Sequence, residues 1–207
     1  MKKILLIVSM ILINMFSYAK LRVGVTLQPY YSFVSNIVGD KMKVVPAIRG
    51  DIYDVHNYKA RPEDIKKMAT LNILVVNGIE HDEFIYGIVR SARMGGKIKI
   101  INANKGVSLM PVSGMRTKTR VMNPHSFISI TSSIQQIYTI ARELGQIDPA
   151  NKAYYNKNAQ AYAQKLRNMK AAAITKVNHL KNLNMRVAAV DGPSGALNRF
   201  SVYPIQA

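Results

Sequence analysis

Short runs typical of β-strands alternate with runs typical of helices over the first half of the chain, and few folds accommodate that order. Residues 21–26 suit a strand, and residues 29–39 then place apolar side chains at helical spacing before a closing glycine. The same alternation predicts further strands at 42–48, 73–77 and 98–102 and further helices at 62–68 and 82–92. It favours an α/β fold with a parallel sheet, whose ligands bind beyond the carboxyl ends of the strands.

One segment indicates the centre of that sheet. Residues 73–76 read Ile-Leu-Val-Val and are therefore apolar on both faces of a strand. A strand of this kind is expected in the middle of a parallel sheet that helices cover on both sides.

The second half predicts two more helices, at 131–144 and from Pro149 to about Leu180, the latter with Asp148 as N-cap. A helix of that length, about 45 Å, suits a strut between two lobes. Beyond it, residues 186–190 suit a strand that begins a second lobe. We therefore expect two Rossmann-like lobes, divided into an N-terminal lobe, an interlobe helix and the start of an incomplete C-terminal lobe, at residues 20–145, 146–182 and 183–207.

Residues 1–19 have the three parts of a secretory signal peptide. Lys2 and Lys3 precede an apolar run from Ile4 to Ile13, and small residues stand before a cleavage point after Ala19. The alternative, a buried N-terminal helix, fits less well, because the run is apolar on every face. The chain has no cysteine, hence no disulfide and no lipid-attachment site. These features predict export to the periplasm.

The formal charge of +18 raises nucleic acid or an anionic membrane as partners. The basic residues are scattered, however, and aromatic residues are not interleaved with them as a stacking platform requires. A solvated basic surface is the simpler interpretation, and we expect no nucleic-acid partner. The sequence has no phosphate loop, nucleophile elbow or zinc-protease helix, so we do not expect an enzyme.

Histidines carry the clearest chemical signal. His56 follows a predicted strand and His125 precedes a predicted helix, and two loop histidines that meet in one crevice would suit a first-row metal ion. Asp191, after the strand at 186–190, is the candidate third ligand or else the N-cap of the next helix. His81 either orients a metal ligand without binding the metal itself, or has no role in the site and merely precedes Asp82, the N-cap of the next helix. We assign no site role to His179.

Two histidine motifs carry a family resemblance. Residues 54–65, Asp-Val-His-Asn-Tyr-Lys-Ala-Arg-Pro-Glu-Asp-Ile, resemble the Asp-Pro-His-x-Tyr-x-x-x-Pro-x-Asp-Ile segment of the zinc and manganese solute-binding proteins of ABC importers (cluster A-I). Residues 123–127, Asn-Pro-His-Ser-Phe, are similar to that family's Asp-Pro-His-x-Trp motif. Residues 144–159 resemble the start of the family's rigid interlobe helix.

The resemblance implies two α/β lobes with a divalent metal, zinc or manganese, bound between them by His56, His125 and a second-lobe ligand. Asp191 stands where that ligand is usually His or Glu, and the segment expected to carry a fourth ligand is missing. The basic residues of the loop at 106–120 and Lys105 also replace a histidine-rich acidic loop.

The function implied is capture of the metal as cargo and delivery to an ABC permease in the inner membrane by a monomeric binding protein. The alternative is a truncated, non-transporting relative, or an adhesin-like interaction protein, that binds no metal.

Overall fold

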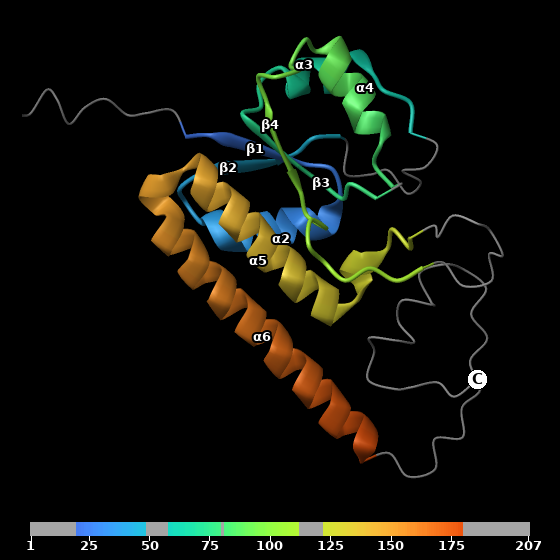
Figure 1. Cartoon of the computed structure of the whole chain (residues 1–207), viewed down its shortest axis with the longest axis vertical. Coiled ribbons are helices and arrows are strands. Elements are labelled where there is room, and N and C mark those ends of the chain that lie inside the picture. Colours follow the sequence, from blue (N-terminus) through green and yellow to red (C-terminus); the bar gives the residue numbers. More distant parts are fainter. Residues whose placement is uncertain (1–19, 49–57, 80, 112–121, 180–207) are drawn as a thin grey trace, which may run out of the picture.

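The computed structural model describes residues 20–48, 58–79, 81–111 and 122–179, and these form a parallel sheet with helices on both faces (Figure 1). The strands are β1 (Arg22–Val25), β2 (Lys43–Pro46), β3 (Ile73–Val76) and β4 (Lys99–Asn102). The helices are α2 (Gln28–Val38), α3 (Pro62–Met68), α4 (Phe84–Ser91), α5 (Ile130–Ile147) and α6 (Lys152–Asn178), with 3-10 turns at Ser126–Ile128 and Pro149–Asn151.

The four strands lie in the order β2-β1-β3-β4, and every pair is parallel. Leaving β1, the chain first moves outward to β2, then crosses back to β3 and continues outward to β4. The direction therefore reverses between β1 and β3. In open α/β sheets such a reversal opens a crevice at the carboxyl ends of the two strands.

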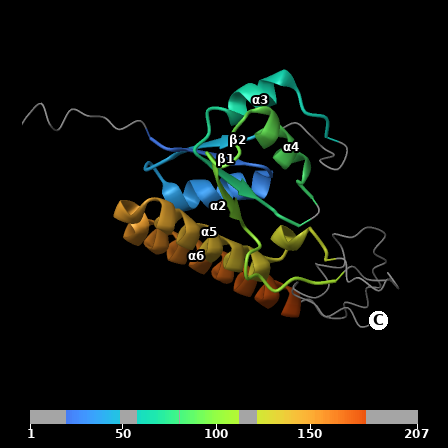
Figure 2. The ribbon, with the colours of Figure 1, turned by 45° about the horizontal axis from the view of Figure 1, so that its top comes forward.

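β3 is buried along its whole length, as its composition predicts. Ile73 and Val75 contribute to a core shared with α2, α5 and α6, whereas Leu74 and Val76 contribute to a second core shared with α3 and α4. The two cores separate the three layers that Figure 2 shows, with the sheet between the helix layers. Burial on both faces explains why β3 is an unbroken apolar run.

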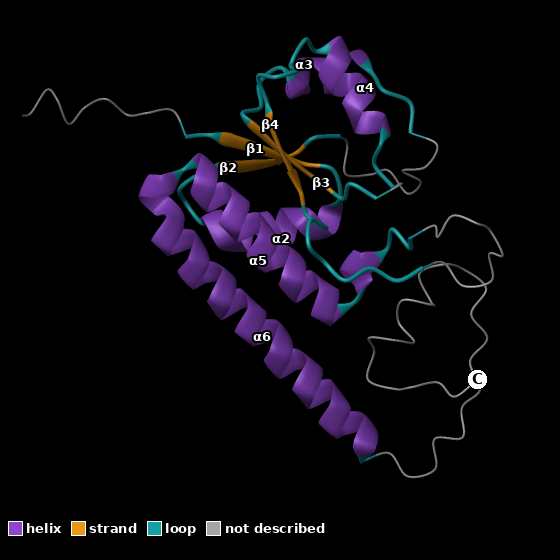
Figure 3. Cartoon of the chain, in the orientation of Figure 1, coloured by secondary structure: helices purple, strands orange, loops and turns teal. Residues whose placement is uncertain are grey.

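α6 packs along α5 and α2 through a stripe of residues spaced four apart, Tyr155, Ala159 and Ala163, which are fully buried. The spacing keeps these side chains on one face of the helix. α6 lies beside α5 and extends past it (Figure 3). No helix within the described ranges is long and apolar enough to cross a membrane.

The predicted order of strands and helices is confirmed over residues 20–179, but the long helix begins later than expected. Asp148 is the N-cap of the 3-10 turn Pro149–Asn151, with Pro149 at its first position, and Asn151 is the N-cap of α6. The Asp148 carboxylate accepts hydrogen bonds from side chains instead, from Asn151 Nδ2 at 2.8 Å and Tyr155 Oη at 2.6 Å. The signal peptide and the second-lobe strand at 186–190 lie outside the described residues.

Candidate metal centre

The candidate site lies at the carboxyl end of the sheet, where the chain direction reverses between β1 and β3. Buried polar residues follow the strands there, with Thr26 after β1, Asn77 after β3 and Asn104 after β4. Because polar side chains are costly to bury without partners, this group has to be hydrogen-bonded internally. The bonds connect the strand ends to the loops that carry His81 and His125.

Asp82 ties the loop after β3 to the sheet. Its Oδ2 accepts hydrogen bonds from Thr26 Oγ1 at 2.5 Å and from the backbone N–H of Asn77 at 2.6 Å. Its Oδ1 accepts the backbone N–H of Gly78 at 3.1 Å. The expectation that Asp82 caps a helix is therefore wrong, because Glu83 is the N-cap of α4 and the Asp82 carboxylate points back to the strand ends.

Asn123 fixes the orientation of His125. Its Oδ1 accepts the backbone N–H of His125 at 2.9 Å and lies 3.1 Å from His125 Nδ1. A carbonyl oxygen only accepts hydrogen bonds, so the ring contact requires a proton on Nδ1. Nε2 then carries the lone pair, which is the tautomer that a metal ligand needs.

A directional chain of amides holds the backbone next to His125. Gln136 Nε2 donates to Asn104 Oδ1 at 2.8 Å, and Asn104 Nδ2 donates to the Asn77 backbone oxygen at 2.9 Å and to Asn77 Oδ1 at 3.0 Å. Asn77 Nδ2 in turn donates to the Pro124 carbonyl at 3.1 Å. Ser126 joins the chain, since its hydroxyl donates to Asn104 Oδ1 and accepts from Gln136. The histidine loop is thus fixed to α5 and to two strand ends.

Tyr30 completes this network from α2, because its hydroxyl donates to Asn77 Oδ1 at 2.5 Å. Burial, and secondarily the charge of Asp82, raises the pKa of the Tyr30 phenol well above its ordinary value. The hydroxyl therefore keeps its proton, and the hydrogen bond to Asn77 persists throughout the neutral range.

His81 and His125 come together although they are 44 positions apart in the sequence. Their ring centroids are 5.0 Å apart, with the ring planes at 73°. Phe127 contacts both rings, with centroid distances of 5.8 Å to His81 and 6.1 Å to His125. His81 is buried. The two imidazole rings, both packed against Phe127, therefore form a pair of adjacent nitrogen donors.

The other predicted ligands, His56 and Asp191, lie outside the described residues. Within those residues, no group of three or more His, Asp or Glu side chains is arranged to hold a metal ion. Sequence reasoning missed the amides Asn77, Asn104 and Gln136. An asparagine at the end of a predicted strand, or within two residues of it, is a usable signal for the first two, whereas Gln136 lies inside a helix and no sequence signal identifies it.

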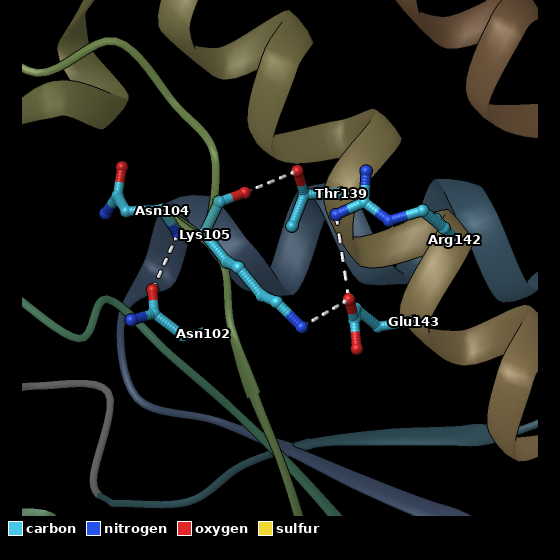
Figure 4. Close-up of polar contacts among 6 residues, drawn as sticks. All are labelled: Asn102, Asn104, Lys105, Thr139, Arg142 and Glu143. Carbon is cyan, nitrogen blue, oxygen red and sulfur yellow. Dashed lines mark hydrogen bonds and ion pairs between the residues drawn. The ribbon is translucent and has the colours of Figure 1, made fainter.

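One ion pair and one hydrogen bond connect Lys105, just before the basic loop, to α5 (Figure 4). Lys105 Nζ lies 3.2 Å from Glu143 Oε1, Arg142 contacts the same oxygen at 3.6 Å, and Thr139 Oγ1 donates to the Lys105 carbonyl at 3.1 Å. The Lys105 side chain is 66% exposed, so the pair itself contributes little stability. Its positive charge is nevertheless partly balanced by Glu143.

Comparison with known proteins identifies the family to which the sequence is similar. Residues 23–193 match the family model described as ZnuA, the periplasmic zinc-uptake complex component A. The chain is 28% identical over 181 residues to the metal ABC transporter substrate-binding lipoprotein ScbA of Streptococcus cristatus, covering 84% of this chain and 57% of that protein. It is also 28% identical over 159 residues to the high-affinity zinc uptake system protein ZnuA of Bacillus subtilis, covering 72% and 49%.

Solved structures of the binding protein FpvC of Pseudomonas aeruginosa are similar in fold and sequence. The complex with Ni²⁺ has a TM-score of 0.76 and 46% identity, covering 87% of this chain and 63% of that one. The complex with Mn²⁺ has a TM-score of 0.78 at the same identity and covers 87% and 64%. The chain spans about half the length of the curated relatives above. With a family model matched over most of its length, this chain belongs to the ZnuA family, whose members are substrate-binding proteins of ABC transporters and not enzymes.

Proposed function

We propose that this protein captures a divalent transition-metal ion, zinc or manganese, outside the cytoplasmic membrane and delivers it to the permease of an ABC importer. The observation that carries the proposal is the 3.1 Å contact between His125 Nδ1 and the side-chain oxygen of Asn123, which orients the imidazole ring and favours a proton on Nδ1. The orientation of this ring is thus preorganised for metal binding in the metal-free protein.

The ligand set that we propose is His56, His125 and Asp191, two imidazoles and one carboxylate, with water able to fill a further position. Imidazole and carboxylate together suit both zinc and manganese. The named substrates of the relatives include zinc and manganese, and FpvC has been crystallised with Ni²⁺ and Mn²⁺. We further propose a periplasmic, monomeric protein released from a signal peptide that is cut after Ala19.

The first test is elemental analysis of the chain from Lys20 onward, purified without chelator, beside its His56→Ala, His125→Ala and Asp191→Ala variants. We expect near-stoichiometric zinc or manganese in the parent and a large loss in each variant. His179→Ala is the matched control, because His179 is the C-cap of α6 and carries no predicted site role, and the substitution should leave the metal content unchanged.

An absence of metal from the parent protein and every variant, with the fold intact by circular dichroism, would contradict the proposal. It would favour a relative that keeps the lobe for another interaction. Delivery is tested separately, by uptake of labelled zinc in cells that carry the importer but lack their own binding protein.

A further inference from the structure

We propose that His81 is a direct ligand of the bound metal ion, in place of the outer role that the sequence left as one alternative. With His125 it would form a preassembled pair of imidazole ligands on a single lobe. This inference rests on the proposed function, and it concerns a residue that neither family motif contains.

The spacing of the two rings carries the argument. When two imidazoles bind one metal at about 2.1 Å, each ring centroid lies roughly 3.2 Å from the ion, and a tetrahedral angle then separates the centroids by about 5 Å. The His81 and His125 centroids are 5.0 Å apart. The observed separation of the two rings therefore matches that of two imidazoles that share one ion.

The loops that carry the two histidines are both fixed. The His81 loop is held by its neighbour Asp82, whose carboxylate accepts three hydrogen bonds from Thr26, Asn77 and Gly78. The His125 loop is held through its own backbone N–H, bound to Asn123, and through the Pro124 carbonyl, bound to Asn77. Asn77 thus contacts both loops, so the distance between the rings is set by the sheet edge.

Burial favours an inner role as well. Only 9% of His81 is exposed, and Phe127 lies against both imidazoles. An apolar wall limits competition from bulk water and leaves each ring few directions in which to turn. A ligand pair preorganised in this way loses less freedom when the ion binds.

The experiment is long-range proton–nitrogen NMR of the Lys20-onward chain, with ¹⁵N in its histidine rings, before and after addition of one equivalent of zinc. The chain has four histidines, so single His→Gln variants assign every ring by elimination. We expect one nitrogen of His81 and one of His125 to shift to positions typical of zinc-bound imidazole. The resonances of His179 should not move.

Chelator competition supplies the second measurement. His81→Gln should weaken zinc binding by more than about 100-fold, beyond the 10- to 100-fold that loss of an outer partner typically costs. His179→Gln is the matched control and should leave the affinity unchanged.

The failures can be told apart. If the parent chain binds zinc and the His81 nitrogens keep their metal-free positions, His81 is not a ligand and this inference falls while the proposed function stands. If the parent chain binds no zinc, nickel or manganese, both fall. The parent spectrum decides between these results even if a His81 variant does not fold.

Discussion

Replacing Asn123 by alanine gives the sharpest test of how the site is built. The substitution removes one oxygen that accepts two hydrogen bonds, from the His125 backbone N–H at 2.9 Å and from Nδ1 at 3.1 Å. The ring then loses the partner that keeps the proton on Nδ1 and must be ordered when the ion binds. Loss of such a partner typically lowers metal affinity 10- to 100-fold, or about 1.4–2.7 kcal/mol.

Asn123→Asp is the matched variant, because a carboxylate accepts both hydrogen bonds at the same reach. Its affinity for zinc should stay closer to that of the parent than the affinity of Asn123→Ala. Competition with a fluorescent chelator at pH 7.5 measures all three proteins, and urea unfolding of the metal-free forms separates affinity from stability. Equal zinc affinity of the alanine variant and the parent would refute the orienting role.

Three further predictions concern the scaffold. Gly39→Ala should lower the free energy of unfolding by about 1–3 kcal/mol, because φ at Gly39 is +53° and the new Cβ would lie 2.3 Å from Tyr154 Oη. Gly96→Ala is the control: φ there is +73° but no atom lies within 4 Å of the new Cβ, so it should lower the free energy of unfolding, measured with urea, by only about 1 kcal/mol. Asp82→Asn should lower the free energy of unfolding by about 2–3 kcal/mol in the same assay. Both carboxylate oxygens of Asp82 accept hydrogen bonds, and the amide group that replaces one of them would place its own N–H groups against those donors. The raised pKa of Tyr155, caused first by burial and then by its hydrogen bond to a carboxylate, means that its stabilising contribution is complete below about pH 10 and is lost as pH rises toward the folded value. Melting temperatures from pH 8 to 11 should therefore fall less steeply for Tyr155→Phe, and an unchanged slope would contradict this assignment.

The sequence predicts the fold well because its pattern is strong and local. The apolar run at β3 and the glycine that closes α2 mark their elements within a residue or two. The later start of the long helix has a physical cause. A short acidic side chain followed by proline suits an N-cap, but here the carboxylate is satisfied by the Tyr155 hydroxyl and Asn151, and the helix proper begins later.

The site is only partly predictable from the sequence. A motif identifies His125, but nothing local shows that His81 lies against it, because that contact depends on how β3 and the loop before α5 meet at the sheet edge. The chain of amide hydrogen bonds from Gln136 to Asn77 likewise depends on the tertiary structure and leaves no local signal in the sequence. Three residues from three elements acquire a common role only when the strands are in register.

The strand order described above also bears on how fast the protein can fold. β1 pairs with β3 in the register Val23 to Ile73, so the middle of the sheet forms only when residues fifty positions apart meet. Closing a loop of that length costs roughly 3.5 kcal/mol of chain entropy, apart from a constant. Sequence-distant pairing of this kind slows folding relative to a sheet of hairpins. The chain thus has an interval in which its helices can begin to form while β3, its most apolar strand, is still without a partner.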